Sequence, residues 1–440
     1  MEILTARRLV VSLAVLTATG CALYSDVSIE PLTVIPTKIE RGADLKDMVR
    51  RADYLRAVEL APSIDARQRK SADELLSLAQ AELAANRLPA ARQHFRAAIE
   101  LAPFHTVYAD AAWGISQAEY MDNNFETSLE WAQIAMDHGL NVLQWHLDYL
   151  KALSHVEVYK LAGGPRTDDL RMKIGRPDVP RVEVRLDKSP TPVTAVIDSG
   201  AVLSIVSQRL ATQVGIKRLP VSRGTFYGLL GEPISVDFAM IETLDLGDIQ
   251  LANVPVAIMP DDKMRFLVTG KKEFRMDFLI GANLLKEFRL EFDFDRSRVT
   301  MTKLTSVDKH PVDDQNLFFE GFRPQVRGTI NKRGWYMFVL DTGSEVTFLN
   351  ESQIAAMPIN MFAPRVHSAT LQGLGGAKKH GSKVDQVEIG IDRWAGAFRT
   401  LPMYSGSEQE RSVGIVGENF LKNFKTIIDF GRMRVDLARR

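Results

Sequence analysis

Two stretches of sequence decide the fold: Val-Ile-Asp-Ser-Gly at residues 196–200 and Val-Leu-Asp-Thr-Gly at residues 339–343. Each is an apolar strand that runs into Asp-Ser/Thr-Gly. A second motif follows each of them, Ile-Gly-Ala-Asn at 280–283 and Val-Gly-Glu-Asn at 416–419. The aspartates at positions 198 and 341 are 143 residues apart, and the second-motif glycines at positions 281 and 417 are 136 residues apart. We infer that one domain has been duplicated within the chain.

Each copy supplies one carboxyl group, Asp198 from the first and Asp341 from the second. Two carboxyl groups that face each other across a pseudo-twofold axis share one proton, because like charges so close cannot both ionise readily. The ionised partner of such a pair can take a proton from water while the protonated partner polarises a carbonyl group. The sequence therefore predicts a catalytic pair that hydrolyses peptide bonds without a covalent intermediate.

The residues that follow each aspartate are expected to support the pair. Gly200 and Gly343 lack a Cβ, so they suit a tight turn in which each loop approaches its symmetry mate. The hydroxyl groups of Ser199 and Thr342 can donate across the axis to the backbone of the opposing loop. Such hydrogen bonds would hold both carboxyl groups coplanar.

The two copies differ one place beyond the glycine, where the second copy has Ser344 and the first has Ala201. A hydroxyl group that donates to the charged form of a carboxyl group lowers its pKa. We therefore predict that Ser344 donates to Asp341, which leaves Asp341 ionised and the proton mostly on Asp198. A coupled pair also predicts a pH optimum on the acid side of neutral.

These motifs resemble those of aspartic peptidases of the retropepsin/pepsin superfamily, and in particular of bacterial retropepsin-like enzymes with two copies in one chain. The resemblance covers residues 178–440. It implies an all-β bilobal fold with two pseudo-symmetric β-barrel lobes, at 178–305 and 306–440. It also implies an aspartic-type endopeptidase, a hydrolase that acts on a polypeptide substrate and needs no cofactor and no metal.

A glycine-rich hairpin is predicted at 224–231, about thirty residues after the first aspartate. In pepsin-like enzymes a Tyr-Gly at this point closes over the substrate, and Tyr227-Gly228 matches that pair. The second copy has Gly373 in the equivalent glycine-rich stretch, without a tyrosine. The resemblance implies that these three residues belong to substrate-binding flaps. The alternative for Tyr227 is that its ring packs on its own hairpin.

Residues 46–160 have the composition and spacing of helices. Tyr-x-x-Ala-x-Glu-Leu-Ala-Pro at 54–62 recurs as Phe-x-x-Ala-x-Glu-Leu-Ala-Pro at 95–103, 41 residues later. The pattern resembles tetratricopeptide repeats, and the alternative is a plain helical bundle. Stacked helix pairs form a concave surface, which suits holding a protein partner or a substrate. A linker is predicted at 161–177, where glycine and proline interrupt the helical period.

The first 21 residues have the pattern of a secretory signal: two arginines, an apolar stretch, then small residues before Cys21. The stretch resembles the lipobox of a bacterial lipoprotein, in which the cysteine is acylated. This predicts a lipid anchor at Cys21, a tether at 22–45, and a place in the bacterial cell envelope facing the periplasm. The alternative is ordinary signal cleavage and secretion, with Cys21 incidental.

The composition of the chain argues against several other classes of function. The chain has 55 basic and 55 acidic residues, so nothing indicates a nucleic-acid partner. It has one cysteine, which excludes internal disulfides, and its eight histidines lack the spacing of metal ligands. Two alternatives to an active peptidase stay open: a catalytically weak peptide-binding module, and an envelope scaffold that uses the helical repeats.

Overall fold

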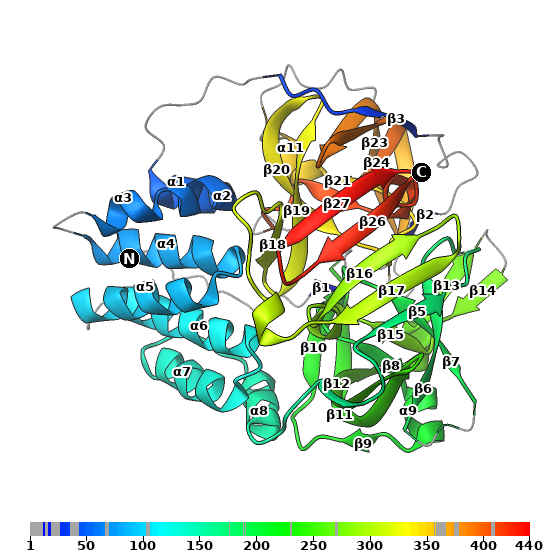
Figure 1. Ribbon diagram of the computed structural model, residues 1–440, viewed down its shortest axis with the longest axis horizontal. Coiled ribbons are helices and arrows are strands. Elements are labelled where there is room, and N and C mark those ends of the chain that lie inside the picture. Colours follow the sequence, from blue (N-terminus) through cyan, green and yellow to red (C-terminus); the bar gives the residue numbers. More distant parts are fainter. Residues whose placement is uncertain are drawn as a thin grey trace.

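The computed structural model describes residues 12–13, 16–18, 27–35, 44–66, 70–102, 106–175, 177–187, 189, 191–228, 231–268, 272–355, 357, 367–373, 378–405 and 410–440. Within these ranges the chain forms a helical region on one side of two β-barrel lobes (Figure 1). The prediction of two barrel lobes, one from each copy of the duplicated motifs, is confirmed.

The helical region buries small side chains between its helices. Its elements are α1 (Leu45–Arg50), α2 (Tyr54–Glu59), α3 (Ala61–Asp65), α4 (Ala72–Ala84), α5 (Leu88–Leu101), α6 (Thr106–Met121), α7 (Phe125–Asp137) and α8 (Gln144–Leu153). Helix α4 begins at a capping box between Ser71 and Glu74, which satisfies two free N–H groups at its start. The ring of Phe95 packs on Gly114 of α6, where a Cβ would lie 2.2 Å from it. Small residues thus allow the close helix pairing, while the repeat class stays a prediction.

The first lobe is built on a curled ten-stranded sheet. Its strands include β6 (Arg181–Leu186), β7 (Val193–Ile197), β8 (Ile205–Ser207), β9 (Lys217–Arg218), β10 (Gly224–Gly228), β11 (Pro233–Leu246), β12 (Ile249–Met259) and β15 (Phe278–Ile280). The hairpin β13 (Arg265–Val268)–β14 (Lys272–Arg275) and the short helices α9 (Gln208–Val214) and α10 (Ala282–Leu285) complete it. Strand β15 pairs in parallel with β7 and antiparallel with β8.

The second lobe repeats this topology. Its strands are β18 (Leu317–Glu320), β19 (Arg323–Ile330), β20 (Arg333–Leu340), β21 (Phe348–Asn350), β22 (His367–Gly373), β23 (Lys378–Ile391), β24 (Trp394–Tyr404) and β25 (Gly414–Val416), with helices α11 (Glu351–Ala355) and α12 (Glu418–Leu421). Strand β25 pairs in parallel with β20 and antiparallel with β21, as β15 does with β7 and β8. The duplication seen in the sequence is therefore a duplication of strand topology.

A five-stranded antiparallel sheet joins the two lobes (Figure 1). Its order is β27 (Arg434–Arg439), β26 (Phe424–Asp429), β16 (Phe288–Asp293), β17 (Arg298–Lys303) and β5 (Thr167–Arg171). The closing strand of each copy meets the other here, because Leu290 of β16 is opposite Ile428 of β26. One continuous sheet therefore links the lobes.

Two predicted connectors contain short strands that the sequence analysis did not predict. Within the predicted linker at 161–177, β4 (Lys160–Gly163) pairs with β12, and β5 pairs with β17. Within the predicted tether at 22–45, β3 (Ser28–Pro31) pairs with β24. These are short strands at sheet edges, held by backbone hydrogen bonds, so their side chains need not alternate between apolar and polar. Glycines and prolines near these strands indicated loops in the sequence, so the strands were not predicted.

The beginning of the chain also supplies edge strands. Strand β1 (Ser12–Leu13) pairs in parallel with β10 opposite Tyr227 and Gly228. Strand β2 (Leu16–Ala18) pairs antiparallel with β22 opposite residues 371–373. Both partners belong to the hairpins predicted as flaps. Residues 12–13 and 16–18 of the segment predicted as a secretory signal thus lie along the edges of the two hairpins, and Cys21 itself lies outside the described residues.

The helical region packs against the first lobe. Lys286 donates from Nζ to the backbone carbonyl of Met121, at the end of α6, at 2.9 Å. This ammonium group is buried and also bonds Glu287 of its own lobe at 2.7 Å. Trp145 of α8 stacks on Phe238 of β11 with ring centroids 5.4 Å apart. A buried hydrogen bond from an ammonium group and an aromatic stack therefore fix the helices to this lobe.

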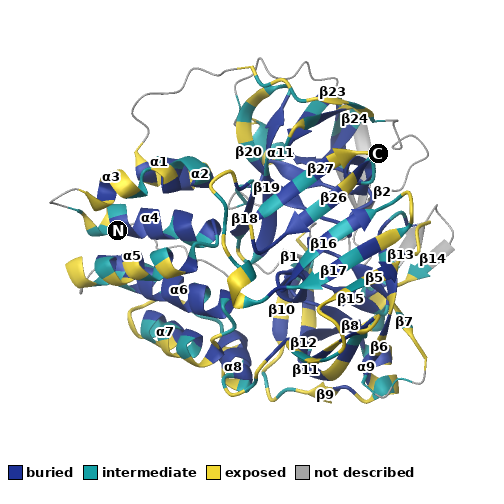
Figure 2. Ribbon diagram, viewed as in Figure 1, coloured by how far each residue is buried: buried dark blue, intermediate teal, exposed yellow. Residues whose placement is uncertain are grey.

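The helical region also packs against the second lobe. Arg411 donates to the hydroxyl group of Tyr54, in α2, at 3.2 Å, and to the carbonyl of Val49 at 3.1 Å. Gln315 donates to the carbonyl of Ala85, the residue that caps α4, at 3.2 Å. Buried residues continue across the boundary between helices and lobes (Figure 2). The helices thus contact both lobes at once, and a protein partner on them stays a prediction.

No helix within the described ranges is long and apolar enough to cross a membrane.

Candidate active site

Both predicted aspartates lie at the carboxyl end of a central strand. Strand β7 ends directly before Asp198, and β20 ends directly before Asp341. The backbone N–H of Asp198 donates to the carbonyl of Ile280 in β15 at 2.9 Å. The N–H of Asp341 donates to the carbonyl of Val416 in β25 at 3.0 Å. The second sequence motif of each copy therefore fixes the backbone of its aspartate.

The two loops bring the carboxyl groups together. Asp198 and Asp341 are both completely buried. A Cβ on Gly200 would lie 2.4 Å from Cγ of Asp341, and a Cβ on Gly343 would lie 2.3 Å from Cγ of Asp198. Each glycine thus passes directly against the carboxyl group of the other lobe. Only glycine allows this approach at these two positions.

Hydroxyl groups hold the two loops to each other. Ser199 donates from Oγ to the carbonyl of Leu340 at 2.7 Å, and Thr342 donates from Oγ1 to the carbonyl of Ile197 at 2.8 Å. In return, Thr342 Oγ1 accepts from the N–H of Ser199 and Ser199 Oγ accepts from the N–H of Thr342, both at 3.1 Å. These four buried hydrogen bonds cross between the lobes, in the pattern expected from the sequence.

Burial raises the pKa of both carboxyl groups. Burial raises the pKa of Asp198 to about 7, although its Oδ1 accepts from the N–H of Ala201 at 3.0 Å. Burial, followed by the negative charge of Asp198, raises the pKa of Asp341 well above its ordinary value. The negative charge of an ionised Asp198 therefore opposes ionisation of Asp341, so the pair keeps one proton.

The predicted role of Ser344 is wrong. Its hydroxyl group donates to the backbone carbonyl of Val346 at 2.8 Å rather than to a carboxylate. The Oδ1 atom of Asp341 accepts instead from the N–H of Gly343 at 2.9 Å. Ser344 thus stabilises the turn after the motif and does not lower the pKa of Asp341. The sequence-based reason for an ionised Asp341 is therefore absent.

One oxygen of each aspartate has no donor among the described residues. These atoms are Oδ2 of Asp198 and Oδ2 of Asp341, and both are buried. Buried acceptors without partners are rare in proteins and are often found where a reaction takes place. A proton shared between the two carboxyl groups gives one of these oxygens a partner. The other can accept a hydrogen bond from a reacting molecule.

The asparagine of each second motif holds the strand that follows the catalytic loop. Asn283 accepts at Oδ1 from the N–H of Ser204 at 2.7 Å and from its hydroxyl group at 2.9 Å. Asn419 accepts in the same way from Thr347, at 2.9 and 2.7 Å. The repeated motif in the sequence included both asparagines, but it did not indicate which groups they bind. The hydroxyl residue six places after each aspartate was the signal for this contact.

A group of charged residues below the second loop escaped the sequence analysis. The carboxylate of Glu345 accepts from the N–H of Asp178 at 2.5 Å, and Lys422 forms an ion pair with Asp178. Glu418 is buried nearby, and burial raises its pKa well above the ordinary value. Glu345 lies two residues after Gly343, and Glu418 lies inside the second motif, so charged residues at these positions could have identified them.

The predicted flap residues lie on two hairpins. Tyr227 and Gly228 end β10, and Gly373 ends β22 in the other lobe. The neighbouring Phe226 is buried at the base of the first hairpin, with its ring centroid 6.0 Å from that of Trp145 in α8. The first hairpin is therefore packed against the helical region at its base. The contact of these residues with substrate stays a prediction.

Within the described part of the chain, no group of three or more histidine, cysteine, aspartate or glutamate side chains could hold a metal ion.

Several known proteins are similar to parts of this chain. Among solved structures, the chain is similar to a retropepsin-like aspartic protease from Rickettsia conorii, with 14% identity over 33% of this chain and 96% of that one and a TM-score of 0.22. It is also similar to an aspartic proteinase from Irpex lacteus, with 11% identity over 62% of this chain and 97% of that one and a TM-score of 0.34. No curated protein matches the chain. A family model described as aspartyl protease matches residues 182–284, so the first lobe carries the sequence pattern of that family.

Proposed function

We propose that this protein is an aspartic endopeptidase whose catalytic residues are Asp198 and Asp341. The pair of carboxyl groups carries the proposal. Both groups are fully buried, and each lies against the glycine of the other lobe. One oxygen of each group has no hydrogen-bond donor among the described residues. Two buried carboxyl groups without a cation between them are costly to maintain. A role in acid–base catalysis explains why both are present.

The raised pKa values assign a task to each carboxyl group. Asp198, ionised, takes a proton from a water molecule whose oxygen attacks the peptide carbonyl carbon. Asp341, protonated, gives its proton to the carbonyl oxygen, so that a neutral tetrahedral diol forms. As the C–N bond breaks, Asp198 returns its proton to the leaving nitrogen and Asp341 recovers one from the diol. The pair ends in its starting state, and the products are one carboxylic acid and one amine.

The same pKa values change the expected pH dependence. Asp198 must be ionised to act as the base, and burial raises its pKa to about 7. Activity should therefore increase as the pH rises through about 7. This differs from the sequence-based expectation of an optimum on the acid side of neutral.

The outer edges of the flap hairpins, which pair with short strands of the chain itself, support an extended polypeptide as substrate. Strand β10 has β1 on its edge, and β22 has β2 on its edge, so both edges accept backbone hydrogen bonds from an added strand. Addition of a strand to an open sheet edge is a common mode of peptide binding. Residues 12–18 of the chain itself would then compete with substrate, and their removal with a cleaved leader would open both edges.

The proposal also covers where in the cell the protein works and what its helical region does. We propose that Cys21 carries a lipid anchor and that the protein works in the bacterial cell envelope, as the lipobox-like sequence indicates.

The hydrogen bonds from Lys286 and Arg411 to the helices support a role for the helical region in fixing the two lobes relative to each other. Holding a partner on tetratricopeptide-like repeats is the alternative role for these helices.

Cleavage of denatured casein or a peptide library by the purified Cys21→Ser protein tests the proposal. We expect internal cleavage that pepstatin-type inhibitors stop and that EDTA does not affect. Peptide binding without cleavage would favour the alternative of a peptide-binding module that keeps the fold. Cleavage that EDTA abolishes and zinc restores would overturn the mechanism.

A further inference from the structure

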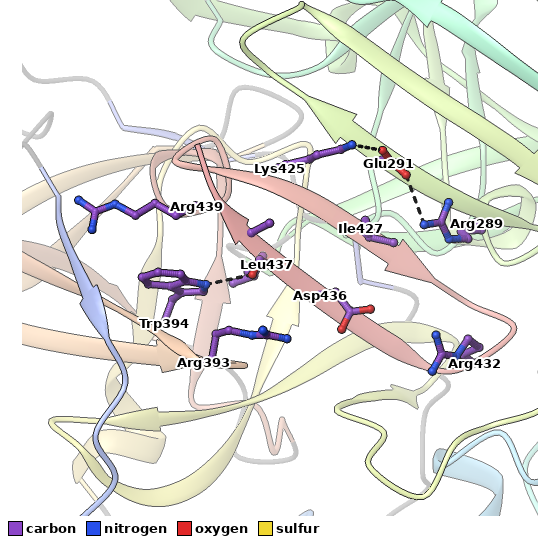
Figure 3. Close-up of a pocket in the computed structure, with 11 residues that line it drawn as sticks. Arg289, Glu291, Arg393, Trp394, Lys425, Ile427, Arg432, Asp436, Leu437 and Arg439 are labelled. Carbon is purple, nitrogen blue, oxygen red and sulfur yellow. Dashed lines mark hydrogen bonds and ion pairs between the residues drawn. The ribbon is translucent and has the colours of Figure 1, made fainter.

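An open cavity of about 650 Å³ lies on the outer face of the five-stranded sheet that joins the lobes (Figure 3). Its floor is formed by Ile427 of β26 and by Leu437 and Ala438 of β27. Trp394, the first residue of β24, forms one wall. The cavity belongs to neither flap and shares no residue with the aspartate pair, so peptide hydrolysis does not explain it.

The cavity is strongly basic. Five basic and two acidic side chains line it, a surplus of three positive charges in a chain with no net charge. The basic residues are Arg289, Arg393, Lys425, Arg432 and Arg439, and the acidic residues are Glu291 and Asp436. A concave surface with one sign of charge raises the local concentration of ligands of the opposite sign. The cavity therefore favours an anion.

Three of these five cations pair with an acidic residue, Arg393 with Asp392 and the other two with Glu291. Glu291 pairs with Lys425 and, at 3.3 Å, with Arg289, so its charge is already shared between two cations. Within the described residues, Arg432 and Arg439 form no ion pair, and both are exposed. Their guanidinium groups can present paired N–H donors, which match the oxygens of a phosphate group.

Trp394 adds an apolar surface beside these charges. Its indole N–H donates to the carbonyl of Leu437 at 3.0 Å, which fixes the orientation of the ring. In Figure 3, Arg393 and Arg439 lie on either side of this ring. A tryptophan flanked by arginines beside an apolar floor is suited to the boundary between lipid headgroups and water. A small soluble anion would gain nothing from the ring.

We propose that this cavity, which we term the Trp394 cavity, binds the phosphate group of an anionic phospholipid at a membrane surface. The exposed arginines would bind the phosphate, and Trp394 would enter the headgroup layer. The five-stranded sheet would then face the membrane. The proposal extends the proposed function by orienting the peptidase on the membrane, and it does not depend on cleavage activity.

The course of the chain is consistent with this orientation. Strand β3 pairs with β24, placing Pro31 opposite Trp394 and Ser28 opposite Ala397. Cys21 is six residues before Val27, a contour length of at most about 20 Å. The four residues from Val27 to Pro31 add about 13 Å. A lipid on Cys21 could therefore enter the same membrane surface that the Trp394 cavity contacts.

Sedimentation with lipid vesicles tests the proposal on the full chain carrying Cys21→Ser, so that no lipid anchor contributes. We expect binding to vesicles that contain phosphatidylglycerol and little binding to vesicles of phosphatidylcholine alone. Arg432→Gln with Arg439→Gln should lower the partition coefficient about 25-fold, about fivefold for each charge removed. Trp394→Ala should lower it further at high salt, where charge attraction is screened.

The matched control is Arg185→Gln with Lys217→Gln, which removes two exposed charges from the first lobe. Equal loss of binding in both double variants would overturn the proposal, because general charge would then explain it. Binding to inorganic phosphate without binding to vesicles would also overturn it and indicate a soluble ligand. Casein cleavage by the Arg432/Arg439 variant should equal that of its parent, so failure of the peptidase proposal would be seen separately.

Discussion

Replacing Thr342 by valine tests the hydrogen bonds that join the two catalytic loops. The substitution keeps the size of the side chain and removes one buried hydroxyl group. Two groups of the opposite lobe then lose their partners: the carbonyl of Ile197, at 2.8 Å, and the N–H of Ser199, at 3.1 Å. Each unsatisfied buried backbone group costs about 1–3 kcal/mol. The free energy of unfolding should therefore fall by about 2–6 kcal/mol.

The same substitution should lower kcat, because the hydroxyl lattice fixes the carboxyl groups relative to each other. A misplacement of about 1 Å in a catalytic group can cost about a hundredfold in rate. The assay combines guanidinium unfolding with kcat on a cleavable peptide.

Thr342→Ser is the matched control, since it keeps the hydroxyl group that the first copy has as Ser199. Loss of one methyl group should cost about 1 kcal/mol. If the valine and serine variants had the same stability and the same kcat, the cross-lobe hydrogen bonds would not support the site.

Three further predictions concern the site and the flaps. Gly343→Ala should abolish cleavage, because its Cβ would lie 2.3 Å from Cγ of Asp198; activity near that of the parent protein would contradict the close approach. Ser344→Ala should leave the acid limb of the pH–rate profile near pH 7, since its hydroxyl group bonds the backbone; a shift of the limb would restore the sequence-based role. Removing residues 1–20 should lower KM without changing kcat, because β1 and β2 then leave both flap edges; an unchanged KM would show that they do not compete with substrate.

The sequence was sufficient to predict the parts of the site that are repeated. Two copies of one motif had to fold alike, so the positions of Asp198 and Asp341 at the ends of equivalent strands followed from the duplication. The donors across the axis also followed, because Ser199 and Thr342 are the only hydroxyl residues between each aspartate and its glycine.

Other features depended on information that the sequence does not carry. The hydroxyl group of Ser344 had two acceptors within reach, and the turn of the backbone placed the carbonyl of Val346 nearer. Strands β4 and β5 are short and each places only one leucine against the core, Leu161 and Leu170, so no alternating side-chain pattern marked them. The contact between Lys286 and the end of α6 joins residues 165 positions apart, which only the packed structure can reveal.

The most direct measurement of the proposed mechanism is peptide cleavage by Asp198→Asn and by Asp341→Asn, each compared with the parent protein at neutral pH. Asparagine keeps the shape of the side chain and cannot exchange a proton, so each variant lacks half of the shared pair. We predict that each rate falls by a factor of at least about a thousand while the circular dichroism spectrum stays unchanged. A rate within about tenfold of the parent in either correctly folded variant would contradict the aspartate pair as the catalytic centre.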